Sequence, residues 1–173
     1  MKQQYLYIVS AVAIIILILG IYMATQNNHP ITVKTGDNVS VYYTVGFTNG
    51  TTYQSNFGQS PLFFVVGAGT LIPGFENAVI GMEINQTKNV TIPENEAYGP
   101  INPNLIQHVP ISKFNNPNVS VGMAVQTVVN GQPLQGIVKA VNSTNVTVDF
   151  NSPLAGHTLI FTIKVLSINA SKS

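Results

Sequence analysis

The side chains that most often perform acid–base or metal chemistry are few in this chain. Its three histidines, His29, His108 and His157, lie far apart, with no i, i+4 pair and no carboxylate at ligand spacing, so we expect no metal site. Glu94 and Glu96 could be posed as a catalytic carboxylate pair, but a solvated loop edge fits them better. Cysteine is absent and no serine stands in a Gly-x-Ser-x-Gly elbow, so neither nucleophile is indicated. What the chain offers is apolar and aromatic groups near glycines.

The most informative stretch, residues 67–76, joins an apolar strand at Leu62–Val66 to a short helix. Its Gly67-x-Gly69 lacks a third glycine and a following Lys-Ser or Lys-Thr, which excludes a phosphate-binding loop. Apolar residues at i, i+3, i+4 and i+7 predict the helix, and they are Phe75, Ala78, Val79 and Met82. Gly81 is expected to end this helix as a left-handed cap.

Strands are expected on both sides of this stretch. From Asn38 the sequence alternates, with Val39, Val41, Tyr43, Val45 and Phe47 facing one way, which is typical of a half-buried strand. Asn49-Gly50 is a hairpin-turn signal, and a return strand begins at Thr51. Further strands are expected at Thr87–Ile92 and, near the end of the chain, at Thr158–Ile168.

The segment between Asn102-Pro103 and Asn151-Ser152-Pro153 has a different character, and proline is a natural punctuator at such boundaries. Short strands are expected there at residues 123–129, 134–141 and 146–150, with turns at Asn130-Gly131 and Asn142-Ser143. We interpret this segment as an all-β subdomain inserted in a loop of the host domain.

Composition excludes one class of partner. Charged residues make up only 8% of the 173 residues, against roughly 25% in an average soluble domain. The seven basic residues are all lysines and are scattered, and the net charge is +1, so the chain has no electrostatic footprint for nucleic acid.

An uncharged run, Tyr5–Ala24, precedes the predicted domains. About 20 apolar residues suffice to span the hydrocarbon core of a bilayer, and tyrosines lie near both ends of this run, as interfacial aromatics do. A cleaved signal peptide is the main alternative, but its apolar core is usually about 7–15 residues long. A buried core helix is a further alternative. We expect an uncleaved membrane anchor.

The distribution of charge gives this anchor a direction. Lys2 and the terminal amine precede the run, and no charge follows until Lys34, so the amino terminus is expected in the cytoplasm and the remainder outside the cell membrane, as a single-pass protein. Eight Asn-x-Ser/Thr sequons all follow the run. They are compatible with a glycoprotein, and equally with a surface that is rich in Asn and Thr and carries no glycans.

Eight short sequence motifs follow one another between residues 34 and 168. They are Gly36-Asp37, Val41-Tyr42-Tyr43-Thr44, Asn49-Gly50-Thr51-Thr52-Tyr53, Pro61-Leu62-Phe63-Phe64, the stretch 67–76, Gly81-Met82, Ile92-Pro93 and Ala97-Tyr98-Gly99. Each is weak alone, but their combination and spacing are specific. On these motifs the chain resembles the FKBP-type peptidyl-prolyl cis-trans isomerases. The insert after Ala97-Tyr98-Gly99, which ends in Pro153-Leu154-Ala155-Gly156, resembles the long SlyD-like form.

The resemblance implies an α+β fold in which a curved antiparallel sheet wraps on a short helix. With the anchor, it divides the chain into a cytoplasmic tip (1–4), a transmembrane helix (5–24), a linker (25–33), a discontinuous isomerase domain (34–102 and 153–170) and an insert-in-flap domain (103–152). In the SlyD-like form, that insert binds unfolded chains.

The resemblance also implies site residues. Those that match the family's proline pocket are Tyr43, Tyr53, Leu62, Leu71, Ile72, Phe75, Tyr98 and Phe161. Phe75 matches the aromatic floor, while the Ile72 N–H and the Tyr98 hydroxyl match the groups that hydrogen-bond to the bound peptide. For the aromatics, core packing is the alternative from the residues alone, and the two roles are compatible because the pocket is one face of the core.

Two positions depart from the family pattern. Gln54 stands where the family usually has an aspartate beside the tyrosine matched by Tyr43, where the carboxylate supports catalysis. Ser152 replaces a common histidine, and the His-rich metal-binding tail of some relatives is missing. We therefore expect a monomeric isomerase that needs no cofactor or metal and that acts on unfolded or Pro-containing polypeptides. One alternative is a binding-only chaperone whose pocket is impaired at Gln54, and another is a structural cell-surface domain with no peptide site.

Overall fold

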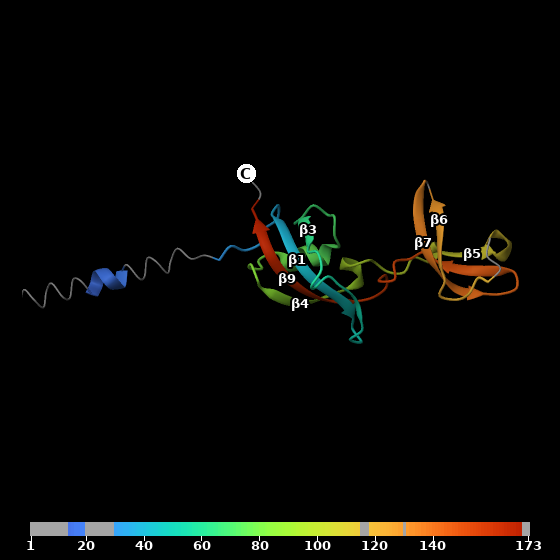
Figure 1. Cartoon of the computed structure of the whole chain (residues 1–173), viewed down its shortest axis with the longest axis horizontal. Coiled ribbons are helices and arrows are strands. Elements are labelled where there is room, and N and C mark those ends of the chain that lie inside the picture. Colours follow the sequence, from blue (N-terminus) through green and yellow to red (C-terminus); the bar gives the residue numbers. More distant parts are fainter. Residues whose placement is uncertain (1–13, 20–29, 115–117, 130, 171–173) are drawn as a thin grey trace, which may run out of the picture.

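The computed structural model describes residues 14–19, 30–114, 118–129 and 131–170. Residues 30–170 of this set form two antiparallel sheets that lie apart along the long axis (Figure 1). One sheet has five strands in the order β2-β1-β9-β4, with β3 also paired to β1. The other has four strands in the order β5-β8-β7-β6.

The five-stranded sheet is assembled from segments distant in sequence. Its strands are β1 (Asn38–Phe47), β2 (Thr52–Ser55), β3 (Leu62–Val65), β4 (Thr87–Ile92) and β9 (Leu159–Asn169). The closing strand β9 lies between β1 and β4 and pairs antiparallel with both. The expected hairpin joins β1 to β2, with Gly50 at φ 88°.

The alternation predicted for β1 is confirmed. Val39, Val41 and Val45 are buried, and they share one hydrophobic core with the inward residues of β9. On the opposite face, the Ser40 and Ser167 hydroxyls lie 2.6 Å apart across the two strands, which satisfies the polar group of the buried Ser40.

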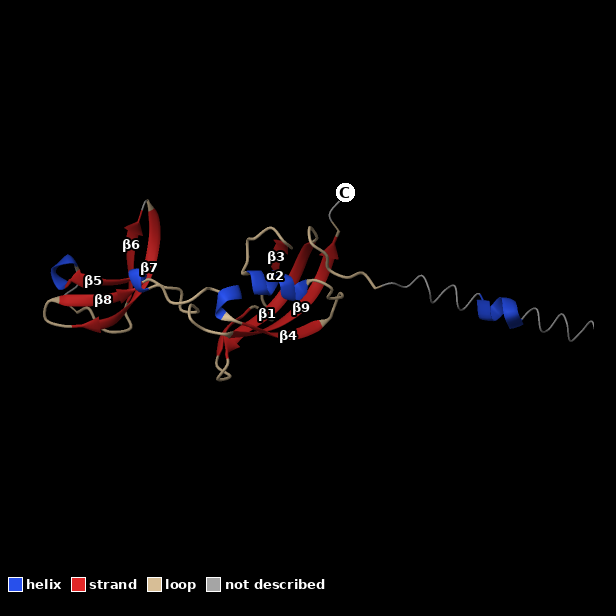
Figure 2. Ribbon diagram, turned by 180° about the vertical axis from the view of Figure 1, so that it is seen from behind, coloured by secondary structure: helices blue, strands red, loops and turns tan. Residues whose placement is uncertain are grey.

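The one α-helix among the residues described from 30 to 170, α2 (Pro73–Val79), packs on that core and contacts β4 and β9 (Figure 2). Phe75, Ala78 and Val79 are buried along the predicted face. Gly81 does adopt φ 79° just past the end of the helix, but it does so in a turn that the Met82 N–H closes on the Val79 carbonyl, and its own N–H donates to the Val33 carbonyl, so the predicted left-handed cap is replaced by a type II turn. At Gly74 a Cβ atom would collide with the Ile92 side chain, so the absent side chain lets α2 approach β4 closely.

The four-stranded sheet consists of β5 (Ile106–Pro110), β6 (Ala124–Val129), β7 (Gln132–Val141) and β8 (Asn145–Asp149). Its core is small, with Val138, Val146 and Val148 fully buried. Strand β5 was not predicted. It is an edge strand that pairs only with β8, and its Gln107, His108 and Pro110 mask the alternation that marked the other strands.

An α+β host domain with a separate all-β sheet is thus confirmed. Most of the predicted anchor (Tyr5–Ala24) lies outside the described residues. The part that is described, residues 14–19, is helical and exposed. Among the described residues there is no helix of the length and apolar character that would cross a membrane. Val33, from the segment predicted as a linker, is buried in the core of the five-stranded sheet and hydrogen-bonds to the Met82 carbonyl.

Candidate active site

A cavity of about 450 Å³ opens between α2, the concave face of the five-stranded sheet and the loop that follows β4. Its lining residues are mostly apolar or aromatic, and they are Tyr43, Val45, Gln54, Leu62, Thr70, Leu71, Ile72, Pro73, Phe75, Ala97, Tyr98, Leu154 and Phe161. Eight of the nine residues predicted for the site line this cavity. We refer to it as the proline cavity, after the pocket that the family resemblance predicts.

Three aromatic rings from three different elements form its base. Phe75 of α2 lies 5.4 Å from Phe161 of β9 and 5.8 Å from Tyr43 of β1, measured between ring centroids. Both contacts are edge-to-face, with interplanar angles of 73° and 83°, an arrangement that aromatic pairs favour. Phe75 and Phe161 are almost fully buried, so the base of the cavity is also part of the core.

The rim of the cavity is held by one buried carboxylate. Glu76, in the first turn of α2, accepts hydrogen bonds from the Gly67 N–H at 2.8 Å and the Leu71 N–H at 3.2 Å, with a longer contact to the Gly69 N–H at 3.5 Å. These donors span the glycine loop between β3 and α2. The helix thus fixes the loop that carries Leu71 and Ile72.

Two hydrogen-bond donors remain available at this rim. Within the described residues, no group accepts a hydrogen bond from the Ile72 N–H or contacts the Tyr98 hydroxyl by a hydrogen bond. Ile72 precedes α2, and its carbonyl already accepts from the Phe75 and Glu76 N–H groups. Partial burial raises the pKa of the Tyr98 hydroxyl above its usual value, and the Tyr43 and Tyr53 hydroxyls raise it further. Tyr98 is therefore a neutral donor at ordinary pH.

Comparison with known proteins identifies the family to which this fold and cavity belong. The family model of the FKBP-type peptidyl-prolyl cis-trans isomerases matches residues 29–166. A probable FKBP-type 16 kDa peptidyl-prolyl cis-trans isomerase of Pseudomonas fluorescens is 37% identical over 134 residues, which cover 76% of this chain and 89% of the relative.

The chain belongs to the FKBP-type peptidyl-prolyl cis-trans isomerases.

Other relatives agree with this assignment. A short-type peptidyl-prolyl cis-trans isomerase of Methanocaldococcus jannaschii is 42% identical over 113 residues, or 65% of this chain and 71% of the relative. The SlyD protein of Helicobacter pylori, an FKBP-type isomerase, is 40% identical over 114 residues, or 65% of this chain and 61% of the relative. The chain is thus a SlyD-like peptidyl-prolyl cis-trans isomerase, an enzyme whose family acts on Pro-containing polypeptides.

Tyr53 is the one predicted site residue that does not line the proline cavity. Tyr53 is 46% exposed, and its ring packs edge-to-face on Phe47, with the ring centroids 6.1 Å apart. Its hydroxyl still lies near enough to Tyr98 to influence the pKa of that group. Gln54, the residue at the position of the family's aspartate, does line the cavity and is paired with Val45 across β1 and β2.

Five lining residues were not predicted, namely Val45, Thr70, Pro73, Ala97 and Leu154. Four of them neighbour predicted residues in the sequence or in strand pairing, so adjacency could have found them. Leu154 lies far along the chain, after the insert, and is buried against the core. The Pro153-Leu154-Ala155-Gly156 motif was the available signal, but it served only to mark the end of the insert.

The four-stranded sheet has a cavity of its own, with a volume of about 820 Å³. It lies among β5, β6, β7, β8 and the connections that flank β5, and we call it the insert cavity. It is lined by the apolar Leu105, Val109, Phe114, Val125, Leu134, Val148 and Phe150 and by Asn104, Gln107, Lys113, Gln126 and Thr127.

Proposed function

We propose that this isomerase accelerates X-Pro rotation in unfolded proteins outside the cell membrane, and that its insert holds those proteins while the proline cavity acts. The observation that carries the proposal is the aromatic cavity built by Tyr43, Phe75 and Phe161, with the Ile72 N–H and the Tyr98 hydroxyl at its rim.

The chemistry required is rotation about a partial double bond. Amide resonance imposes a barrier of about 18–20 kcal/mol on that rotation. Cis and trans X-Pro forms differ by only about 0.5–1 kcal/mol, so the enzyme needs to change the rate and not the equilibrium. The twisted transition state has lost resonance and carries less charge on its carbonyl oxygen than the planar amide. An apolar cavity therefore penalises the planar form more than the twisted one, which is the differential binding that speeds a reaction.

The two rim donors orient the peptide. The Ile72 N–H and the Tyr98 hydroxyl can donate to peptide carbonyls while the proline ring rests on Phe75. Because Glu76 holds the loop before Ile72 in place, this donor is preorganised and loses little entropy when the peptide binds. No proton is transferred, so the scarcity of acid–base groups in the lining is compatible with the reaction.

The insert cavity supports the holding role. Its apolar side chains, with Leu134, Phe114 and Phe150 only half-buried, present an unfilled surface suited to the apolar side chains of an unfolded segment. Lys113 is the charged residue of its lining, so selection by charge is weak and recognition rests on apolar contact. A segment held there raises the effective concentration of its prolines at the neighbouring cavity.

The location rests on the sequence. The uncharged run 5–24, preceded by Lys2, favours a tether with the domains outside, and the eight sequons that follow it favour glycosylation on that side. Two of these sequons begin at the exposed loop residues Asn49 and Asn142. Neither asparagine lines the proline cavity or the insert cavity.

Gln54 favours a second function, in which the chain binds unfolded proteins and barely turns over. Its amide keeps hydrogen-bonding capacity in the cavity but lacks the carboxylate charge of the family's usual aspartate.

Proline-limited refolding of a model protein, with the full chain in detergent, tests the proposal. We expect acceleration that Phe75→Ala and Tyr98→Ala abolish, while both variants still suppress aggregation through the insert. Suppression of aggregation without any acceleration by the wild type would favour the binding-only function. Topology is tested separately by protease protection in membrane vesicles, in which cleavage after residue 30 from the cytoplasmic side contradicts the external location.

A further inference from the structure

Two connections join the five-stranded and the four-stranded sheet, and hydrogen bonds link the two connections to each other. The outgoing connection runs from Ala97 to Leu105 and the returning one from Phe150 to Gly156. Three sets of hydrogen bonds link them. The Phe150 N–H donates to the Leu105 carbonyl at 2.9 Å, and the Gly156 N–H donates to the Gly99 carbonyl at 2.8 Å. Asn151 and Asn102 form the set between these two.

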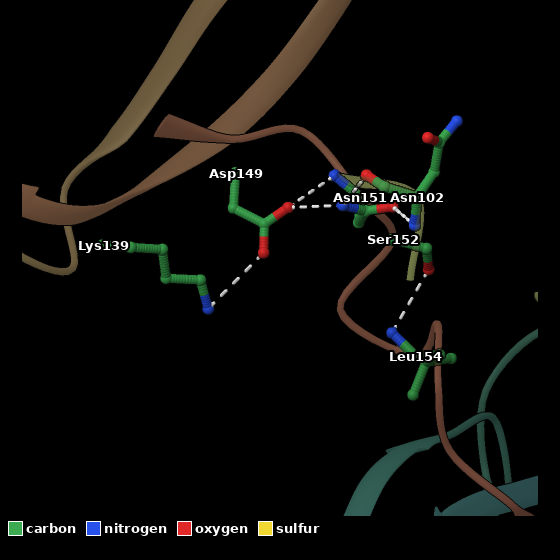
Figure 3. A network of polar contacts seen from close by, with 6 residues as sticks. All are labelled: Asn102, Lys139, Asp149, Asn151, Ser152 and Leu154. Carbon is green, nitrogen blue, oxygen red and sulfur yellow. Dashed lines mark hydrogen bonds and ion pairs between the residues drawn. The ribbon is translucent and has the colours of Figure 1, made fainter. Parts of the chain in front are cut away.

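Asn151 makes that middle link in both directions (Figure 3). Its Oδ1 accepts from the Asn102 N–H at 2.9 Å, and its Nδ2 donates to the Asn102 carbonyl at 3.1 Å. Asp149 orients the amide, since its Oδ1 accepts from the Asn151 Nδ2 at 2.8 Å and from the Asn151 N–H at 2.9 Å. The Asp149 carboxylate also faces Lys139 of β7, 4.0 Å away. The half-buried Asn151 amide is thus held by the outgoing connection on one side and by the end of β8 on the other.

The ends of the bonded pair reach both cavities. At one end, Leu105 and Phe150 line the insert cavity. At the other, Tyr98 on the outgoing connection and Leu154 on the returning one line the proline cavity. Leu154 follows Asn151 through a turn in which its N–H donates to the Ser152 Oγ at 3.2 Å (Figure 3). The same few residues therefore connect the walls of the two cavities.

We infer that Asn151 is a positioning residue that couples the two cavities, by keeping the two connections paired so that a chain held in the insert is presented to the proline cavity. The effective concentration of a tethered substrate depends on the length and stiffness of the link between the sites. Without the Asn151 amide, each connection moves more independently and this concentration falls. The inference rests on the proposed function, because it requires the insert to hold unfolded chains.

The experiment assays the full chain and its variants with two substrates. A proline tetrapeptide is short enough to occupy the proline cavity alone, whereas an unfolded protein uses both cavities. We expect Asn151→Ala to lower kcat/KM for proline-limited refolding roughly fivefold and to leave kcat/KM for the tetrapeptide within about twofold of wild type. Asn151→Asp serves as a second variant, because it keeps the acceptor for the Asn102 N–H but loses both donated bonds. It is expected to show the same split.

Asn102→Ala is the matched control. The Asn102 groups that bond to Asn151 belong to the backbone, so this variant loses an amide from the same pair and keeps the link. It loses only the hydrogen bond that the Asn102 Oδ1 accepts from the Asn104 N–H. Its refolding and tetrapeptide rates are expected to match wild type. Equal losses on both substrates in the Asn151 variants, or no loss on either, would overturn the inference.

A binding measurement separates this inference from the proposed function. A labelled, proline-free unfolded polypeptide is titrated with each protein and followed by fluorescence anisotropy. We expect wild type and both Asn151 variants to bind it with the same Kd. Absence of binding by wild type contradicts the holding function and the inference with it. Equal binding without the substrate split contradicts the coupling alone.

Discussion

Glu76 accepts a hydrogen bond from the Leu71 N–H at 3.2 Å, and this contact ties the first turn of α2, the only α-helix described between residues 30 and 170, to the rim of the proline cavity. The other oxygen of the same carboxylate accepts from Gly67 at the start of the loop. One side chain thus sets the shape of a segment whose sequence, rich in glycine, would otherwise be free to vary. The rim is rigid because of a residue that does not line the cavity.

Replacement of Glu76 by glutamine is predicted to loosen the rim. A glutamine has one acceptor oxygen, and its NH₂ would face the backbone donor that lost its partner. The loss of charge-assisted hydrogen bonds is expected to cost about 1–3 kcal/mol of unfolding free energy. Denaturant unfolding measures this cost, and tetrapeptide kinetics should show a raised KM. Glu83→Gln, on the exposed turn that precedes β4, is the control. Unchanged stability and KM in Glu76→Gln would show that the loop keeps its shape unaided.

The raised pKa of the Tyr98 hydroxyl predicts how kcat/KM depends on pH. Its pKa is raised above the usual value of about 10, chiefly by burial, so the protonated donor persists through neutral and mildly alkaline pH. Since the folded pKa exceeds the unfolded one, the associated stability is fully present below pH 10 and is lost as the pH rises through the folded value. We expect the kcat/KM profile of the wild type to fall only above about pH 10.

Tyr98→Phe supplies the comparison for that profile. Removal of one hydrogen bond worth about 1–1.5 kcal/mol should lower kcat/KM roughly five- to tenfold at pH 7. Because Tyr98→Phe has no hydroxyl to ionise, its kcat/KM should fall less steeply at alkaline pH than the kcat/KM of the wild type. An identical decline in wild type and variant would assign it to another group or to unfolding, which circular dichroism at each pH distinguishes.

Gln54→Asp is predicted to increase turnover. The family resemblance places a carboxylate at this position of the cavity lining, where a charged acceptor makes a hydrogen bond about twice as strong as a neutral one. A gain of about 1 kcal/mol in transition-state stabilisation corresponds to a roughly fivefold higher kcat/KM. Tetrapeptide kinetics measure it, and Gln59→Asp, on the exposed loop before β3, controls for added charge. A lower rate in Gln54→Asp would mean that this chain has adapted its cavity to the neutral amide.

Leu134→Gln is predicted to weaken the capture of unfolded chains while sparing isomerisation. Leu134 lines the insert cavity but stands outside the buried core of that sheet, so the change places a polar group on the binding surface at little cost to folding. We expect reduced suppression of aggregation and an unchanged tetrapeptide rate. Val128→Gln is the matched control, because Val128 lies in the same hairpin, is 66% exposed and does not line the cavity. Equal effects of the two changes would argue against a binding role for the cavity.

Local patterns in the sequence were sufficient to predict much of the secondary structure. The alternation Val39-Val41-Tyr43-Val45 identified β1, because successive side chains of a strand face opposite sides of a sheet. The spacing of Phe75, Ala78 and Val79 identified α2 for the corresponding helical reason. The sequence pattern does not predict strand β5, because polar residues and a proline interrupt its alternation. It exists because β8 offers an unpaired edge, and that edge is a property of the assembled sheet.

The sequence also predicts which residues form the site, but it does not show how their side chains come together in space. Tyr43, Phe75 and Phe161 come from three elements, and only the placement of β9 between β1 and β4 brings Phe161 to the other two. Leu154 joins them for the same reason. Its position in the cavity depends on the returning connection, whose path is set by bonds to the outgoing one.

The sequence by itself determined the isomerase family, the aromatic material of the proline cavity and the presence of an inserted all-β segment, because these follow from motifs and from short-range periodicity. The tertiary structure alone decided that Glu76 holds the rim, that Tyr53 packs beside Phe47 instead of lining the cavity, and that Asn151 joins the two connections. Each of these depends on where one backbone passes another. Residues distant in the chain acquire such neighbours only when the sheets have formed, and no local pattern encodes them.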